Sequence, residues 1–184
     1  MKTKYINGFT LVEMLLVILI IGIILSLSVP NYSLIRERAR ITAEKMNMHN
    51  VALVIETYFS ETGIYAIDFE DDGYGAYFPG GDPYANPLVM GKLPTNPWTG
   101  AEMDPMEFNP WDYDSPQEVS SDSVGGANDL YDYELEPGEM RYGTWTNNVG
   151  RITQWGLIGM DIQGQSIRSF DATGERVIIF VLHN

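Results

Sequence analysis

An apolar run near the start of the chain constrains the fold more than any other feature. It covers residues 14–29, directly follows Gly8-Phe9-Thr10-Leu11-Val12-Glu13, and Pro30 closes it. As a helix with a rise of ~1.5 Å per residue, residues 9–29 would cover ~30 Å, about the thickness of the hydrocarbon core of a membrane. A carboxylate near the end of such a segment is costly unless it is paired, so the sequence predicts a partner for Glu13.

The helix is expected to continue to about residue 62 with one weak point. Pro30 lacks a backbone donor and clashes with the preceding turn, which predicts a kink or a locally melted segment between Gly22 and Pro30. Gly63 is the expected end of the helix. Beyond Pro30, apolar side chains recur at spacings of three, four and seven and form one stripe, while Glu44 is expected to lie off it. The stripe consists of Ile41, Met48, Ala52, Ile55 and Phe59.

The remainder of the chain is large enough to form a core of its own. Residues 64–139 are rich in Gly, Pro, Asn and Asp without sustained periodicity, which predicts loops. Short β-prone runs separated by turn formers follow at residues 140–146, 151–160, 165–170 and 176–182. The predicted fold class is α+β: a long N-terminal helix, kinked near Pro30, packed against a small antiparallel β-sheet of three or four strands with a long loop region.

Composition argues against several functional classes. The chain has no cysteine, so disulfides, thiol catalysis and zinc–thiolate sites are absent. Residues 68–139 contain 17 acidic residues and one base, Lys92, which argues against binding to nucleic acid and favours a solvated outer face. His49 and His183 are the only histidines, and neither a Ser-His-Asp spacing nor a glycine-rich phosphate loop accompanies them. We therefore predict a protein that is not an enzyme.

The first 60 or so residues resemble type IV prepilins and the pseudopilins of type II secretion. The resemblance lies in a short basic leader that ends in Gly8, in the segment Phe9–Glu13, in Gly22 within the apolar helix, and in Pro30-Asn31-Tyr32. It is specific because it combines a cleavage motif, an acid in an apolar helix and a proline at the matching offset. The family's pilin fold agrees with the predicted fold class.

The resemblance implies a processing and assembly pathway. A prepilin peptidase would cut between Gly8 and Phe9 and methylate the new amino group of Phe9, so the apolar helix stays in the product. The helix would hold the precursor in the inner membrane and, at an assembly platform there, pack with copies of itself into a helical homo-oligomeric filament. The residues that the resemblance assigns to assembly are Phe9, Glu13, Gly22 and Pro30, with Glu13 pairing the Phe9 amino terminus of a neighbouring subunit.

The pattern and the resemblance together predict a division of the chain. Residues 1–8 form a cleaved leader, and residues 9–31 the hydrophobic helix of the membrane and the filament core. Residues 32–62 continue that helix as an amphipathic segment. Residues 63–184 form a globular α+β head, with an acidic loop-rich region at 64–139 and a sheet at 140–184.

Calcium is the one cofactor that the acidic residues suggest. Asp68, Glu70 and Asp72 have the spacing of the first ligands of an EF-hand loop, but Pro79 stands where the bidentate glutamate belongs, so a true EF-hand is rejected. Looser sites would combine these residues with Asp82, or use Asp122, Asp129 and Asp132. Major pseudopilins bind calcium in a comparable loop, whereas acidic loops in general are commonly only solvated.

Two functions stay open. The absence of cysteine and the Pro-Thr-Asn-Pro-Trp turn at residues 94–98 favour a pseudopilin of type II secretion, which forms a periplasmic piston. The large head and the long loop favour a type IV pilin, the subunit of a cell-surface filament, and this is the preferred interpretation. A membrane-anchored enzyme is disfavoured because no catalytic constellation is present.

Overall fold

The computed structural model describes residues 9–69, 74–130 and 135–184, and at residues 27–31 it describes the backbone but not the side chains. The predicted leader, residues 1–8, therefore lies outside the description. The chain divides into an N-terminal unit, Met1–Ala39, and a head, Arg40–Asn184.

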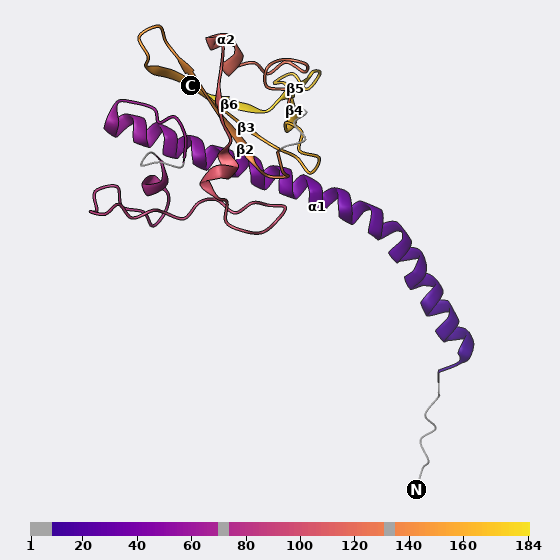
Figure 1. Ribbon diagram of the computed structural model, residues 1–184. Coiled ribbons are helices and arrows are strands. Elements are labelled where there is room, and N and C mark those ends of the chain that lie inside the picture. Colours follow the sequence, from indigo (N-terminus) through magenta and orange to yellow (C-terminus); the bar gives the residue numbers. More distant parts are fainter. Residues whose placement is uncertain (1–8, 70–73, 131–134) are drawn as a thin grey trace. The chain divides into compact units, whose positions relative to one another are not determined.

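A single helix, α1 (Leu11–Thr62), contributes to both units (Figure 1). It is helical through Gly22 and Pro30, so the predicted locally melted segment is wrong, while the kink near Pro30 stays a prediction. Its end is confirmed: Gly63 adopts a φ of 72° and donates its N–H to the carbonyl of Phe59 (2.8 Å). Over the described residues, which leave out the side chains of 27–31, no helix is long and apolar enough to cross a membrane.

Within the head, α1 buries one face. Met48, Val51 and Ile55 are completely buried there, and Ala52 and Phe59 pack against the same core, which confirms most of the predicted stripe. Ile41, the predicted start of the stripe, is only half-buried, and the completely buried face begins about one turn later, at Glu44. The expected position of Glu44 off the stripe is therefore wrong: the spacing of residues 44, 48, 51 and 55 places the carboxyl on the buried face.

The main sheet of the head has four strands in the order β1-β2-β3-β6. They are β1 (Pro110–Asp112), β2 (Met140–Thr146), β3 (Ile152–Gly159) and β6 (Val181–His183). Figure 1 labels β2, β3 and β6 of this sheet. The pairs β2–β3 and β3–β6 are antiparallel, but β1 pairs with β2 in parallel. The predicted purely antiparallel sheet is therefore wrong at this edge, because the long connection at residues 113–139 returns the chain to the end of the sheet from which β1 started.

The C-terminal β-prone run also differs from the expectation. It forms two strands, β5 (Val177–Ile179) and β6, rather than one. The strand β5 pairs with β4 (Arg168–Phe170) in a separate two-stranded sheet, whereas β6 joins the main one. Between them, the Phe180 N–H donates to the carbonyl of Ile167 (2.8 Å), so the chain changes partners at this residue.

The region before β2 is mostly irregular, as predicted. It contains the short helices η1 (Gly75–Tyr77), η2 (Pro105–Phe108) and α2 (Pro116–Val119) in addition to β1. Buried polar side chains supply hydrogen bonds that a regular element would otherwise provide. The Asn128 amide nitrogen donates to the carbonyls of Glu118 (3.0 Å) and Ser121 (2.9 Å), and its oxygen accepts from the Tyr113 hydroxyl (2.8 Å).

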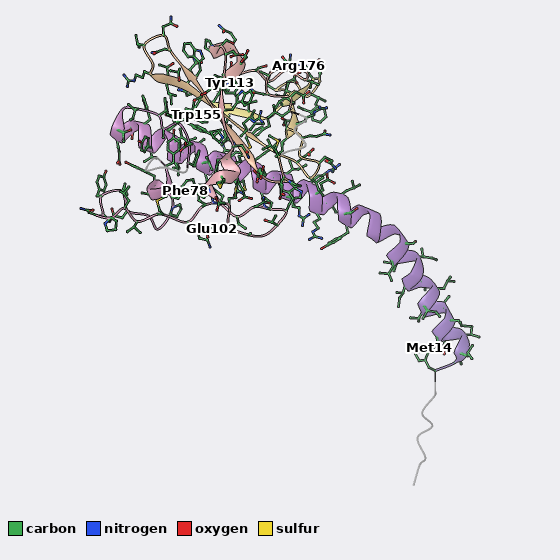
Figure 2. All side chains as sticks on the ribbon, viewed as in Figure 1. Met14, Phe78, Glu102, Tyr113, Trp155 and Arg176 are labelled. Atoms are coloured by element: carbon green, nitrogen blue, oxygen red, sulfur yellow. The ribbon has the colours of Figure 1, made fainter. Side chains whose placement is uncertain are left out.

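Aromatic side chains join these loops to α1 and the sheet. Phe69 stacks on Phe108 with ring centroids 4.1 Å apart. The buried hydroxyls of Tyr74 and Tyr142 lie 2.6 Å apart, and Tyr142 donates to the carbonyl of Ala66 (3.0 Å). Trp155 of β3, labelled in Figure 2, donates its indole N–H to the carboxylate of Glu56 on α1 (2.7 Å). The head therefore has one aromatic-rich core that its long loops help to close.

We predict that Tyr142→Phe destabilises the head by about 1–2 kcal/mol, because it leaves a buried hydroxyl and a carbonyl with one partner fewer. The measurement is chemical unfolding of the full chain followed by near-ultraviolet circular dichroism. Tyr84→Phe is the control, since it removes an exposed hydroxyl that makes a hydrogen bond to Glu61 (2.6 Å), whereas the Tyr142 hydroxyl is buried. Equal losses for the two variants would contradict the prediction.

Candidate functional site

The first turn of α1 brings two of the predicted assembly residues together with one that the sequence analysis did not single out. Phe9 is exposed and immediately precedes Thr10, which caps the helix. The Glu13 N–H donates to the Thr10 hydroxyl (3.3 Å), while the Thr10 N–H and hydroxyl both donate to the Glu13 carboxylate (2.8 and 2.6 Å). This is a capping box, in which residue and cap satisfy each other's donors.

The capping box places a negative charge where the backbone favours one. A carboxylate in the first helical turn interacts favourably with the helix dipole and its unsatisfied N–H groups. The partner that Glu13 has in the single chain is thus Thr10, a neutral residue. The signal was readable in the sequence, because Thr10-Leu11-Val12-Glu13 has the Thr-x-x-Glu spacing of a capping box.

The helix that follows exposes apolar side chains on every side. From Leu11 to Leu25 each large apolar residue is 42–75% exposed, and Met14 marks this segment in Figure 2. A continuous apolar surface of this kind indicates that lipid or another protein covers it. Gly22 borders a shallow depression of about 530 Å³ with Leu15, Ile18 and Ile23. A Cβ at Gly22 would meet nothing within 4 Å, so the packing of the chain itself does not require glycine there.

Two of the predicted assembly and processing residues are described only in part or not at all. Gly8 lies outside the described residues, and Pro30 is described only as part of the helical backbone. The proposed cut between Gly8 and Phe9 and the role of Pro30 therefore stay predictions.

The candidate calcium ligands divide into two groups. Glu70, Asp72 and Asp132 lie outside the described residues. Of the others, Asp129 pairs with Arg168 (3.1 Å), Asp122 pairs with Arg176 (3.3 Å), and Asp82 accepts the N–H of Tyr84 (2.9 Å). Among the residues with described positions, no three acidic or histidine side chains gather as a metal site would require. Calcium stays a prediction, which thermal melts with and without a chelator would test.

Comparison with known proteins identifies sequences that are similar to this chain. Residues 3–29 match the model of the prokaryotic N-terminal methylation motif. The chain is 32% identical over 66 residues to the type IV major pilin protein PilA of Myxococcus xanthus, a match that covers 36% of this chain and 30% of the pilin. It is 27% identical over 137 residues to the type II secretion system core protein G of Pseudomonas aeruginosa, which covers 71% of this chain and 84% of that protein.

The chain carries the N-terminal methylation motif and is similar to a type IV pilin and to a core protein of type II secretion. The capping box and the exposed apolar segment fall inside the methylation motif, and the long helix packed on a small sheet agrees with the pilin fold. Type IV pilins and the pseudopilins of type II secretion are structural subunits rather than enzymes. No solved structure is a significant match to this pilin-like chain.

The two ion pairs of the head allow a matched test of how burial affects the contribution of an ion pair to stability. Its side chain is only 4% exposed, beside an Arg168 side chain that is 36% exposed, whereas Asp122 and Arg176 are 43% and 62% exposed. We predict that Arg168→Met destabilises the head by about 1–3 kcal/mol, because it leaves a buried carboxylate without its cation. Arg176→Met should cost less than about 0.5 kcal/mol, because exposed pairs are screened by water.

Chemical unfolding of the full chain at neutral pH measures both variants. If Arg176→Met proved as costly as Arg168→Met, burial would not be what makes the Asp129 pair important.

Proposed function

We propose that the chain is a structural subunit of a type IV pilus, assembled through packing of the N-terminal part of α1. The observation that carries this proposal is the exposed apolar segment from Leu11 to Leu25 behind the capping box of Thr10 and Glu13. Such a segment needs an apolar environment, and identical helices in a filament core supply one after the membrane has done so for the precursor.

In the described chain Glu13 bonds to Thr10, which is neutral. Processing supplies a positively charged partner. A cut between Gly8 and Phe9 by a prepilin peptidase creates an amino group at Phe9, which is then methylated and stays cationic. The Phe9 amino group of one subunit pairs with the Glu13 carboxylate of its neighbour. In apolar surroundings this pair is strong, and a missing partner strands a charge, so it determines the register of assembly.

The rest of the mature chain suits the outside of such a filament. After removal of Lys2 and Lys4, the chain has 9 basic and 25 acidic residues, and the acidic ones concentrate in the loop-rich region of the head. Acidic, solvated heads keep subunits soluble and keep filaments apart from one another. In this proposal the precursor resides in the inner membrane, an assembly platform there extracts it, and the filament emerges at the cell surface.

We predict that Glu13→Ala leaves the cut between Gly8 and Phe9 largely intact but stops filament growth, because the incoming amino group finds no carboxylate. Mass spectrometry of the membrane fraction measures processing, and electron microscopy of sheared surface material measures filaments. Glu175→Gln, which removes an exposed acid of the head, is the control and should assemble normally. Normal filaments from Glu13→Ala would refute the proposed pairing.

A periplasmic pseudopilin of type II secretion is the second candidate. It is favoured by the extent of the similarity to the Pseudomonas secretion protein, which spans most of both chains, whereas the similarity to the Myxococcus pilin is confined to about a third of each. Deletion of the gene separates the two functions. Loss of surface filaments with normal export of secreted proteins supports a pilin, and the opposite result supports a pseudopilin.

A further inference from the structure

The carboxyl group of Glu44 is the most unusual buried group of the head. It lies on the face of α1 that packs against β3, and its side chain is completely buried. By distance and angle neither carboxyl oxygen accepts a hydrogen bond among the described residues, and the nearby Asn47 amide, which donates to the Thr95 carbonyl, favours the ionised form only weakly. Buried carboxyl groups without a partner are rare, because the ionised form loses its hydration and gains nothing in return.

The geometry shows that this contact is tight. A Cβ added to Gly159, the last residue of β3, would lie 3.0 Å from the Met48 sulfur, 3.1 Å from Glu44 Cγ and 3.3 Å from Glu44 Oε1. Glycine at 159 therefore allows α1 and β3 to approach each other closely at Glu44. Little space is left for water molecules that could solvate an ionised carboxylate.

The charged groups around Glu44 do not neutralise it. Arg40 precedes it by one turn of α1 and Lys45 follows it, yet in the described part of the chain neither base forms an ion pair with it. The Lys45 ammonium lies over the Phe180 ring instead, 4.4 Å from its centroid. Glu107, from η2, faces Glu44 with the same sign of charge.

These surroundings have opposing effects on the pKa of Glu44, and burial is the largest of them. Burial raises the pKa of Glu44 to about 8, the Asn47 amide opposes this rise only in part, and the negative charge of Glu107 adds to it. Asn47 donates its amide to the carbonyl of Thr95 (2.9 Å). Glu139, near the start of β2, is a further acid close to Glu107, and burial also raises its pKa.

We propose that Glu44 is a proton-linked lock between α1 and β3: the neutral carboxyl packs against Gly159, and its ionisation loosens the helix from the sheet. The folded head holds this proton over a pH range in which the unfolded chain has released it. Raising the pH through this range therefore favours unfolding. Below about 4.5 both states are protonated and above about 8 both are ionised, so the Glu44 contribution changes only between these limits.

The test compares the full chain with Glu44→Gln, a neutral side chain of the same size, by chemical unfolding in detergent at pH 5 to 9. Between pH 5 and 8 the unfolding equilibrium constant of the wild type should rise relative to that of the variant by up to about tenfold per pH unit, on the order of a few hundredfold in all. Glu175→Gln, which changes an exposed glutamate, should follow the wild type at every pH. Glu107→Gln should move the wild-type titration to lower pH, because it removes a like charge.

Carbon-13 NMR of glutamate-labelled wild type gives a second readout that does not require the variant to fold. One side-chain carboxyl resonance should titrate near pH 8 and be absent from Glu44→Gln where that variant folds. A constant difference in stability between the wild type and Glu44→Gln across the pH range would overturn the proposal, as would a labelled wild type whose carboxyl groups all titrate below pH 6. Either result would leave the proposed role in a pilus untouched, because the lock lies within the head.

Discussion

The packing of α1 on β3 is the contact on which the rest of the head depends. Met48, Val51 and Ile55 bury the apolar face of the helix there, and Gly159 lets the two elements approach within van der Waals distance. Trp155 adds a hydrogen bond across the same interface, to Glu56. The described loops between residues 64 and 139 have little regular structure, and side chains such as Phe69 and Phe108 join them to this core.

A single helix serves two different purposes along its length. In the N-terminal unit its apolar side chains are exposed all round, which suits a surrounding of lipid or of identical helices. In the head it is amphipathic, with one buried face and one exposed.

The sequence predicted the elements whose signals are local. The end of α1 at Gly63 and the bounds of β2 follow from turn chemistry and periodicity, and both agree with the structure. Strand pairing was harder to predict from the sequence. The parallel alignment of β1 with β2, and the change of sheet at Phe180, depend on the route that the chain takes between strands, which no local pattern encodes. The capping box of Thr10 and Glu13 could also have been predicted, from the Thr-x-x-Glu spacing.

The sequence by itself determined the first turn of α1 and the apolar segment behind it, together with the similarity to pilins and pseudopilins, because a motif and a periodicity need only neighbouring residues. Only the tertiary structure decided the environments of individual charged groups. Glu44 reads as an ordinary helical glutamate until β3 covers it, and Asp129 as an ordinary acidic loop residue until Arg168 lies beside it. The charge of a carboxyl group depends on the water and partners around it, and residues distant in the sequence supply both.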